Sequence, residues 1–262
     1  IPVLGVVPDF GDLGIGEEDT VPTNRFGPWS HSGDVLRIGV VHYPFRSNFT
    51  DFDPFFHEPG VEVRYVTDPA LLDACHVICL PGTKQTMADL DWIQQYGFDQ
   101  AIRQRVQAGA FLVGLCGGYQ MLGERLEDPD GIESALAEAS GLGFLPICTR
   151  FNQDKALYQI EAVHEASGLP LRGYEIHMGE SSALRPTTPF VRIHSRNGQG
   201  VELLDGAIAS NGRVWGCYVH GLFDNADFRR RFLHEVRVAF GLPTPTTVTS
   251  SSENPYDRLA DG

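Results

Sequence analysis

The stretch FLVGLCGGYQMLG, residues 111–123, joins an apolar run to a cysteine that lies between glycines. The run is typical of a buried strand, and the residues after the cysteine favour a helix. A G-x-C-x-G corner of this kind presents a nucleophile on a strained turn, where glycines remove clashes with β-carbons. The start of the helix stabilises a thiolate on Cys116, and the N–H of Gly117 points to where an oxyanion would form. Cys116 is therefore predicted to be a nucleophile, and a buried structural cysteine is the alternative.

The composition limits the partners of the chain. Its 262 residues carry 34 acidic and 20 basic side chains, a formal net charge of −14, which argues against nucleic acid or an anionic membrane as a partner. No apolar run approaches the length of a membrane span. The five cysteines are odd in number and form no C-x-x-C pair, so neither a disulfide framework nor a metal site is predicted. A reducing cytoplasm is the simplest setting for such a chain.

The central part of the chain alternates strands with helices. Short apolar runs at residues 37–43, 61–66, 76–82 and 110–116 are predicted strands, and residues 86–109 show helical spacing interrupted by Gly97. This alternation predicts a doubly wound α/β fold with a mostly parallel sheet. We predict that this domain covers residues 34–242, after a Gly/Pro-rich lead-in at 1–33 and before a disordered tail at 243–262.

Beyond Gly141 the pattern changes to closely spaced strand-like segments. They lie at residues 157–163, 172–179, 190–195, 201–210 and 213–221, and a helix is predicted at 226–240. Strands that follow one another at such short intervals indicate a mixed or antiparallel extension of the sheet. Within the last of these segments His220 comes directly after a predicted strand at 214–219, with Gly221 beside it, and is the predicted base for the thiol.

The segment LPGTK, residues 80–84, ends another predicted strand. In a parallel sheet its loop opens at the same edge as Cys116, so the N–H groups of Gly82 and Thr83 are predicted to complete an oxyanion hole. Among the remaining histidines, His177 in GYEIHMG is the next candidate and is expected to line the site.

Several motifs in order resemble one family. They are RSNFTDFDPF (46–55), LPGTKQTMADLDWI (80–93), GLCGGYQMLG (114–123), DPDGIES (128–134), GLGFLP (141–146), GYEIHMG (173–179) and GCYVHGLFDNADFRRRF (216–232). Together they resemble the glutamine amidotransferase domain of the cobyric acid synthase family, and the likeness runs from residue 1 to about residue 242. It implies a flavodoxin-like class I glutamine amidotransferase fold. Residues 1–21 resemble the end of a preceding synthetase domain.

The resemblance implies a division of labour in cobalamin biosynthesis. The synthetase domain would use ATP and Mg²⁺ to amidate carboxylates of adenosylcobyrinic acid a,c-diamide, and this domain would supply ammonia from L-glutamine. The chain contains no G-x-x-x-x-G-K-[ST] loop, so no cofactor or metal is expected to bind this fragment, and the corrinoid would be met through the synthetase domain. Position by position, Cys116 corresponds to the nucleophile, His220 to the proton relay and Gln120 to a substrate-binding glutamine.

One position departs from many related glutaminases. Leu222 stands where they carry a glutamate that orients the histidine, so Glu175 is the predicted replacement and Asp224 the second choice. Three alternatives remain open: a cobyrinic acid a,c-diamide synthase-type or other amidotransferase glutaminase, a thiol hydrolase using Asp154 or Asp205, and a non-catalytic docking domain.

Overall fold

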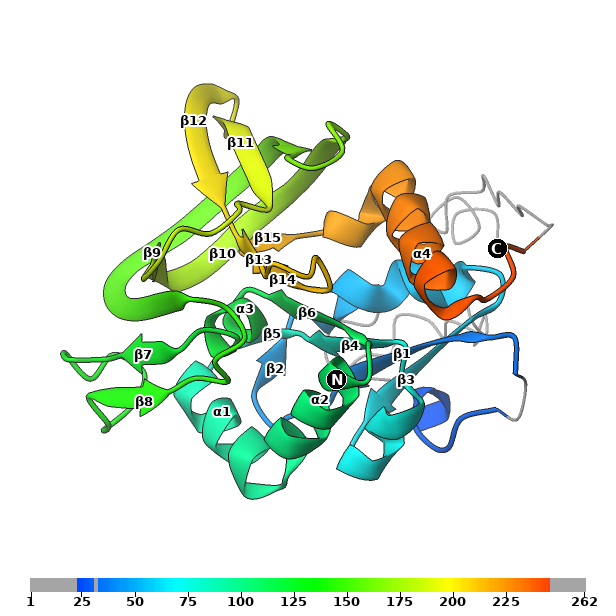
Figure 1. Ribbon diagram of the computed structural model, residues 1–262. Coiled ribbons are helices and arrows are strands. Elements are labelled where there is room, and N and C mark those ends of the chain that lie inside the picture. Colours follow the sequence, from blue (N-terminus) through cyan, green and yellow to red (C-terminus); the bar gives the residue numbers. More distant parts are fainter. Residues whose placement is uncertain (1–22, 31–32, 246–262) are drawn as a thin grey trace, which may run out of the picture.

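A six-stranded sheet forms the centre of the computed structural model, which describes residues 23–30 and 33–245 (Figure 1). The strand order is β13-β14-β6-β4-β1-β3, and all neighbours are parallel except β13 and β14. The strands are β1 (Leu36–Val41), β3 (Val61–Val66), β4 (Val77–Leu80), β6 (Phe111–Leu115), β13 (Ala207–Ile208) and β14 (Val214–Cys217). The predicted doubly wound α/β sheet is therefore confirmed.

Helices cover both faces of this sheet. Side chains alternate along each strand, so Leu112 and Val113 of β6 enter different cores. The first core packs against α4 (Ala226–Phe240) and the 3₁₀ helix η2 (Phe49–His57); the second packs against α1 (Thr86–Gln95), α2 (Phe98–Gln107) and the short α3 (Gly117–Met121). Three further 3₁₀ helices are η1 (Thr23–Arg25), η3 (Pro69–Ala74) and η4 (Leu222–Asp224).

A second sheet extends the fold, as predicted. Its main strands run in the order β12-β11-β9-β10-β15 and are antiparallel, while β7 and β8 attach at its side (Figure 1). These strands are β7 (Arg125–Glu127), β8 (Glu138–Ser140), β9 (Ile147–His164), β10 (Pro170–Ala183), β11 (Val191–Arg196), β12 (Gln199–Asp205) and β15 (Val219–His220). A two-stranded ribbon joins β2 (Arg46–Ser47) to β5 (Gly82–Thr83).

Two predicted elements are divided in the structure. The helical pattern at 86–109 forms α1 and α2, because Gly97 adopts a left-handed conformation with φ 77° between them. The strand predicted at 213–221 ends at Cys217, and the chain then crosses at Tyr218 into the second sheet. His220 thus lies in β15, beside β10, rather than beyond the end of a central strand.

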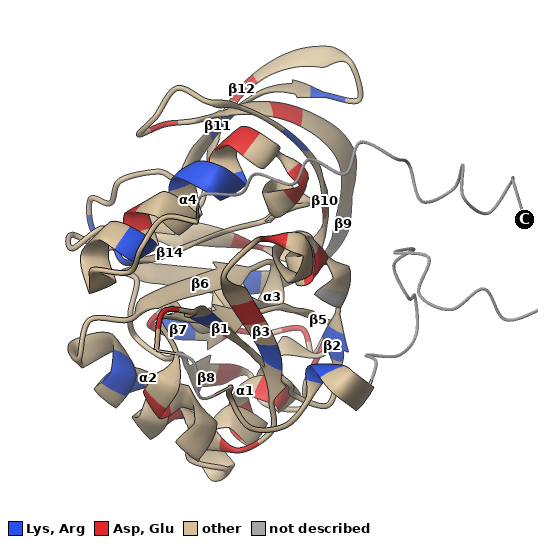
Figure 2. Ribbon diagram, turned by 90° about the vertical axis from the view of Figure 1, so that its right-hand side faces the viewer, with Lys and Arg blue, Asp and Glu red and all other residues tan. Residues whose placement is uncertain are grey.

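In the view of Figure 2, the acidic residues (red) and the basic residues (blue) are interspersed along the ribbon of the strands and helices. No helix in the described part of the chain is long and apolar enough to cross a membrane. The predicted lead-in at 1–33 and tail at 243–262 lie largely outside the described residues, which include only 23–30, 33 and 243–245 of them.

Candidate active site

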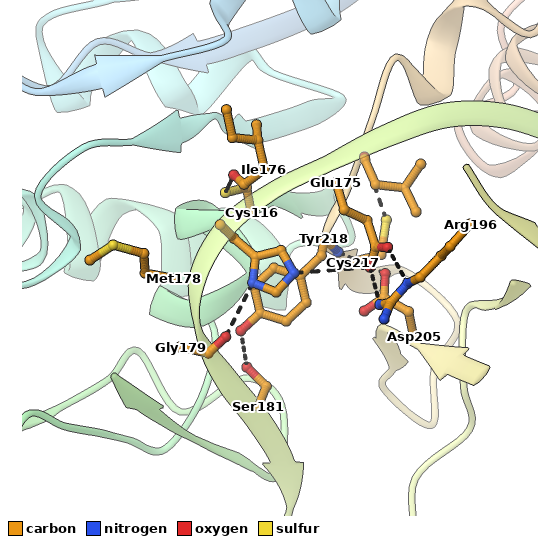
Figure 3. Close-up of polar contacts among 12 residues, drawn as sticks. Cys116, Glu175, Ile176, Met178, Gly179, Ser181, Arg196, Asp205, Cys217 and Tyr218 are labelled. Carbon is orange, nitrogen blue, oxygen red and sulfur yellow. Dashed lines mark hydrogen bonds and ion pairs between the residues drawn. The ribbon is translucent and has the colours of Figure 1, made fainter. Parts of the chain in front are cut away.

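Cys116 occupies the corner between β6 and α3 in a rare backbone conformation. Its φ of 52° and ψ of −113° are unusual for a residue with a β-carbon, and strain of this kind is concentrated at functional sites. Gly118 makes the corner possible, since a β-carbon there would lie 2.0 Å from the carbonyl oxygen of Leu80. The thiol is 6% exposed and donates to the carbonyl of Ile176, with 3.5 Å between Sγ and oxygen (Figure 3).

His220 lies fully buried next to this thiol. Its Nδ1 is 2.7 Å from Oδ2 of Asp51, and the other carboxylate oxygen accepts the backbone N–H of Gly221 at 2.8 Å. The carboxylate fixes the ring so that Nδ1 carries a proton, which leaves Nε2 for chemistry. Nε2 is buried and makes no hydrogen bond within the described residues.

The electrostatics of the site favour an imidazolium. Burial alone lowers the pKa of His220, but the charge and hydrogen bond of Asp51 and the neighbouring Cys116 together raise this pKa well above its ordinary value. An imidazolium beside a thiol favours the thiolate as its counter-ion. Cys116 and His220, which are separated by about a hundred residues in the sequence, are therefore brought together as a nucleophile and base would be.

The prediction that Glu175 orients His220 is wrong. Glu175 receives two hydrogen bonds from Arg196, at 2.8 and 2.9 Å, and its carboxylate is 3.9 Å from Nε2 of His177 (Figure 3). Tyr174 of β10 is paired with His220 of β15. Side chains alternate along a strand, so Glu175, the next residue, points to the opposite face of the sheet from Tyr174. The second choice, Asp224, lies near Gly221, where a β-carbon would be 3.3 Å from its carboxylate, but Asp51 is the residue that accepts the hydrogen bond from Nδ1 of His220.

Sequence reasoning missed Asp51. It lies in η2, in a segment noted only for its family likeness, and 169 positions separate it from His220. No local pattern distinguishes it from the nearby Asp53, which pairs with Arg25 instead. The sequence offers one signal: Leu222 stands where related glutaminases carry the acid that orients the histidine. A carboxylate from another part of the chain is therefore needed, and Asp51 supplies it.

The loop formed by β5 faces the elbow, which is the corner between β6 and α3 that carries Cys116. Lys84 donates its backbone N–H to Phe45 at 2.9 Å, and hydrogen-bonded pairs alternate along an antiparallel ribbon. The N–H of Thr83 consequently points away from β2, and a β-carbon on Gly117 would lie 3.1 Å from this nitrogen. Thr83 and Gly117 are thus placed side by side as two possible oxyanion donors.

Gly82 has a different position from the one predicted. In the same alternation its N–H points toward β2, where the carbonyl of Ser47 lies. A β-carbon on Gly82 would stand 3.2 Å from Cε1 of His220, so the glycine leaves room for the imidazole. The geometry favours Thr83 over Gly82 as the donor.

A pocket of about 240 Å³ opens beside the thiol. Its size is below the roughly 300 Å³ at which pockets for drug-sized ligands begin, which suits a molecule as small as one amino acid. The pocket is lined by the β2–β5 ribbon and the residues beside it, the start of α1, the corner of Cys116 with α3, the turn between β7 and β8, and β10. The lining residues are Ser47, Asn48, Thr83, Lys84, Thr86, Cys116, Gln120, Glu133, Ile176, His177 and Met178.

Gln120 lies in this lining, but its amide already has protein partners. Its nitrogen donates to the carbonyl of Met178 at 2.9 Å and to the hydroxyl of Tyr218 at 3.3 Å, while its oxygen accepts from Thr86 at 3.0 Å. These bonds make Gln120 part of the pocket wall. Its predicted contact with substrate stays a prediction.

Glu133 is a second residue that sequence reasoning missed. It accepts the N–H groups of Thr86 and Met87, at 2.8 and 3.4 Å, at the beginning of α1. Burial is the largest influence on its pKa and raises it to about 7 despite these hydrogen bonds. Asp128 holds the preceding turn by accepting three backbone N–H groups at 2.7–2.8 Å, from Ile132, Glu133 and Ser134.

His177 lines the pocket, as expected. Its ring stacks on Tyr218 with 3.7 Å between centroids, and its Nδ1 is 3.1 Å from the carbonyl of Gly179. Within the described residues no group of three His, Cys, Asp or Glu side chains has the arrangement of a metal site. All five cysteines are free thiols.

A strained cysteine and a buried histidine at the edge of a flavodoxin-like sheet are the features expected of a class I glutamine amidotransferase domain. The chain belongs to the CobB/CobQ-like glutamine amidotransferase domain family, whose model matches residues 37–228. It is 44% identical to a cobyric acid synthase of Chloroflexus aurantiacus over 100% of this chain and 52% of that protein. A cobyric acid synthase of Roseiflexus castenholzii is 43% identical over 99% of this chain and 52% of its own length. The chain therefore spans about half the length of these curated relatives.

Solved structures share the fold at low identity. The structure of PurLQS from Thermotoga maritima superposes with a TM-score of 0.59 and 20% identity, covering 77% of this chain and 99% of that one. A crystal structure of a glutamine amidotransferase gives a TM-score of 0.53 and 17% identity, covering 76% of this chain and 97% of that one. These likenesses agree with the fold predicted from the sequence.

Proposed function

We propose that the chain is the glutamine-hydrolysing part of a cobyric acid synthase and supplies ammonia for the amidation of adenosylcobyrinic acid a,c-diamide. The contact of Asp51 with His220, beside the strained Cys116, is the single observation that carries the glutaminase assignment. The likeness to cobyric acid synthases over the whole chain supports the pathway. The other half of such a protein would use ATP and Mg²⁺ and bind the corrinoid, and the free thiols fit a reducing cytoplasm.

The first half of the reaction forms a thioester. The thiolate of Cys116 attacks the side-chain amide carbon of glutamine, and the carbonyl oxygen takes up the negative charge. The N–H groups of Gly117 and Thr83 stabilise this oxyanion, and loss of one such donor costs about 3–4 kcal/mol of barrier. His220 gives its proton from Nε2 to the departing nitrogen, so that ammonia leaves and an acyl-enzyme remains.

The second half regenerates the enzyme. The now neutral His220 takes a proton from water, which attacks the thioester carbon and forms a second oxyanion in the same place. Collapse of this intermediate releases glutamate and returns the thiolate of Cys116. Asp51 keeps the proton on Nδ1 throughout, so Nε2 alone exchanges protons with the reactants.

Two opposite charges in the pocket match the ends of an amino acid. Glu133 provides a carboxylate for the α-ammonium group of glutamine, and Lys84 provides a cation for the α-carboxylate. A pocket with both charges selects a zwitterion over a simple amide. The side-chain amide would then extend toward Cys116.

The glutaminase proposal is tested by the release of glutamate from glutamine. We expect Cys116→Ala to reduce the rate to background, whereas Cys148→Ala, at another buried cysteine, should retain it. His220→Ala should lose most of the rate as well. Equal glutamate release by wild type and Cys116→Ala would show that the proposed nucleophile is wrong.

The pathway proposal needs the synthetase half. A synthetase half from a related cobyric acid synthase, supplied with ATP, Mg²⁺ and ¹⁵N-amide glutamine, should transfer the label to adenosylcobyrinic acid a,c-diamide. Transfer to cobyrinic acid instead would assign the chain to the cobyrinic acid a,c-diamide synthase type. If glutamate is released but the label reaches neither corrinoid, the chain would be assigned to the glutaminase part of another amidotransferase.

A further inference from the structure

An aromatic ring covers the imidazole of His220. Tyr174 of β10 is the register partner of His220 in β15, and such directly opposed side chains lie on the same face of the sheet. The two rings are stacked, with 5.1 Å between centroids and an angle of 19° between planes. Electron density on the face of a phenol ring attracts a cation above it, and an imidazolium is such a cation.

The position of Tyr174 is itself fixed by the segment that carries the orienting carboxylate. The hydroxyl of Tyr174 accepts a hydrogen bond from the amide of Asn48 at 2.7 Å. Asn48 has a left-handed backbone with φ 52° and directly precedes η2, in which Asp51 lies. One short segment therefore places the carboxylate at the edge of the imidazole and the phenol ring on its face.

The remaining surroundings leave the imidazole little freedom. Gly82 lies so near Cε1 that a β-carbon would be 3.2 Å away. The ionisable groups around the two stacked rings are Asp51 from η2 and Cys116 beside His220, and Asp224 from η4, whose charge acts on the phenol of Tyr174. Tyr174 itself does not line the substrate pocket; it touches the site through the imidazole of His220 and, by its hydroxyl, through Asn48, which lines the pocket.

We propose that Tyr174 is a positioning residue, which holds the imidazolium of His220 toward Cys116 by stacking on it. The inference rests on the proposed glutaminase function. It separates two properties of the side chain: the ring stabilises and orients the imidazolium, and the hydroxyl only fixes the ring through Asn48. Loss of the ring should therefore matter more than loss of the hydroxyl.

The test compares Tyr174→Leu with Tyr174→Phe. We expect Tyr174→Leu to lower kcat for glutamate release about tenfold with KM within about twofold, since a cation–π contact of this burial has that order of effect. Tyr174→Phe should stay within about threefold of wild type because the ring remains. Tyr96→Leu, at an exposed tyrosine that follows α1 and contacts the ring of Trp92 at a tilt, is the matched control and should behave as wild type.

A second readout separates positioning from a merely structural role. The rate at which iodoacetamide alkylates Cys116 is followed against pH in the wild type and in each variant. Without the ring the imidazolium of His220 is less stable and loses its proton at a lower pH. The pH at which the alkylation profile reports this loss should therefore be lower in Tyr174→Leu and unchanged in Tyr174→Phe.

Equal kcat values and pH profiles in wild type and Tyr174→Leu would overturn the proposal. An effect on KM with kcat unchanged would also overturn it. The same holds for an equal fall in kcat in Tyr174→Leu and Tyr174→Phe. If Tyr174→Leu does not fold, Tyr174→Trp keeps a stacking ring and Tyr174→Met removes it, and the same comparison applies. Cys116→Ala tests the glutaminase assignment independently, so failure of either idea can be recognised.

Discussion

Replacing Asp51 by asparagine examines the least expected contact of the site. The carboxylate and the imidazole are both buried, with side-chain exposures of 2% and 0%, so water does not screen their hydrogen bond of 2.7 Å. A hydrogen bond to a charged group contributes about 1.5–3 kcal/mol, which corresponds to a factor of about 10 to 150 in rate. The amide would also donate to Nδ1 and leave the proton on the wrong nitrogen. We therefore expect Asp51→Asn to lower kcat about 100-fold.

The pH dependence gives the sign of the effect. Burial lowers the pKa of His220, whereas Asp51 and Cys116 raise it; without the charge of Asp51, only Cys116 opposes the effect of burial, so this pKa falls. The basic limb of the kcat profile should move to lower pH in Asp51→Asn. Because the pKa of His220 is higher in the folded than in the unfolded state, its protonation stabilises the fold. This stabilisation is complete below about pH 6.5 and is lost as pH rises through the pKa of the folded state. The variant should therefore lose most stability on the acidic side.

Glutamate release and urea unfolding, each measured against pH, test these expectations. Asp53→Asn is the matched control, because it makes the same change in the same helix at a carboxylate that pairs with Arg25. It should keep kcat within about threefold, since its carboxylate makes no hydrogen bond to the imidazole in the described structure. An unchanged kcat and an unchanged profile in Asp51→Asn would refute the reasoning.

Three further changes test the surroundings. Glu133→Gln should raise KM for glutamine about tenfold with kcat nearly unchanged. In the wild type, KM should fall as pH rises through about 7, where this carboxylate ionises. A KM that depends neither on the substitution nor on pH would show that Glu133 does not bind the substrate. Gly82→Ala should lower kcat about tenfold by displacing the imidazole, with little change in Tm, because the new β-carbon meets Cε1 of His220 at 3.2 Å; full activity would show that the ring tolerates it. Asp128→Ala should reduce the free energy of unfolding by about 2–4 kcal/mol, measured in urea, since three backbone N–H groups lose their acceptor; an unchanged value would mean that other groups replace it.

Local patterns predicted the parts of the site that are local. Cys116 was identifiable because the glycines that allow its corner are its neighbours in sequence, and the alternation of strands and helices followed from periodicity. Asp51 had no such signal, since its partner lies 169 positions away. The segment GYEIHMG offers Glu175 as the acid beside His177, but the structure pairs this carboxylate with Arg196. Glu133 owes its position to the turn fixed by Asp128, which sequence spacing does not reveal.

The wide spacing of Asp51, Cys116 and His220 has a consequence for synthesis of the chain. The imidazole receives its carboxylate only when segments 169 positions apart have met, so contacts between distant segments must form before the thiol is activated. A partly made chain that contains the elbow would still lack β15 and would carry an ordinary, poorly reactive thiol. The onset of thiol alkylation during refolding should therefore report the meeting of these distant segments.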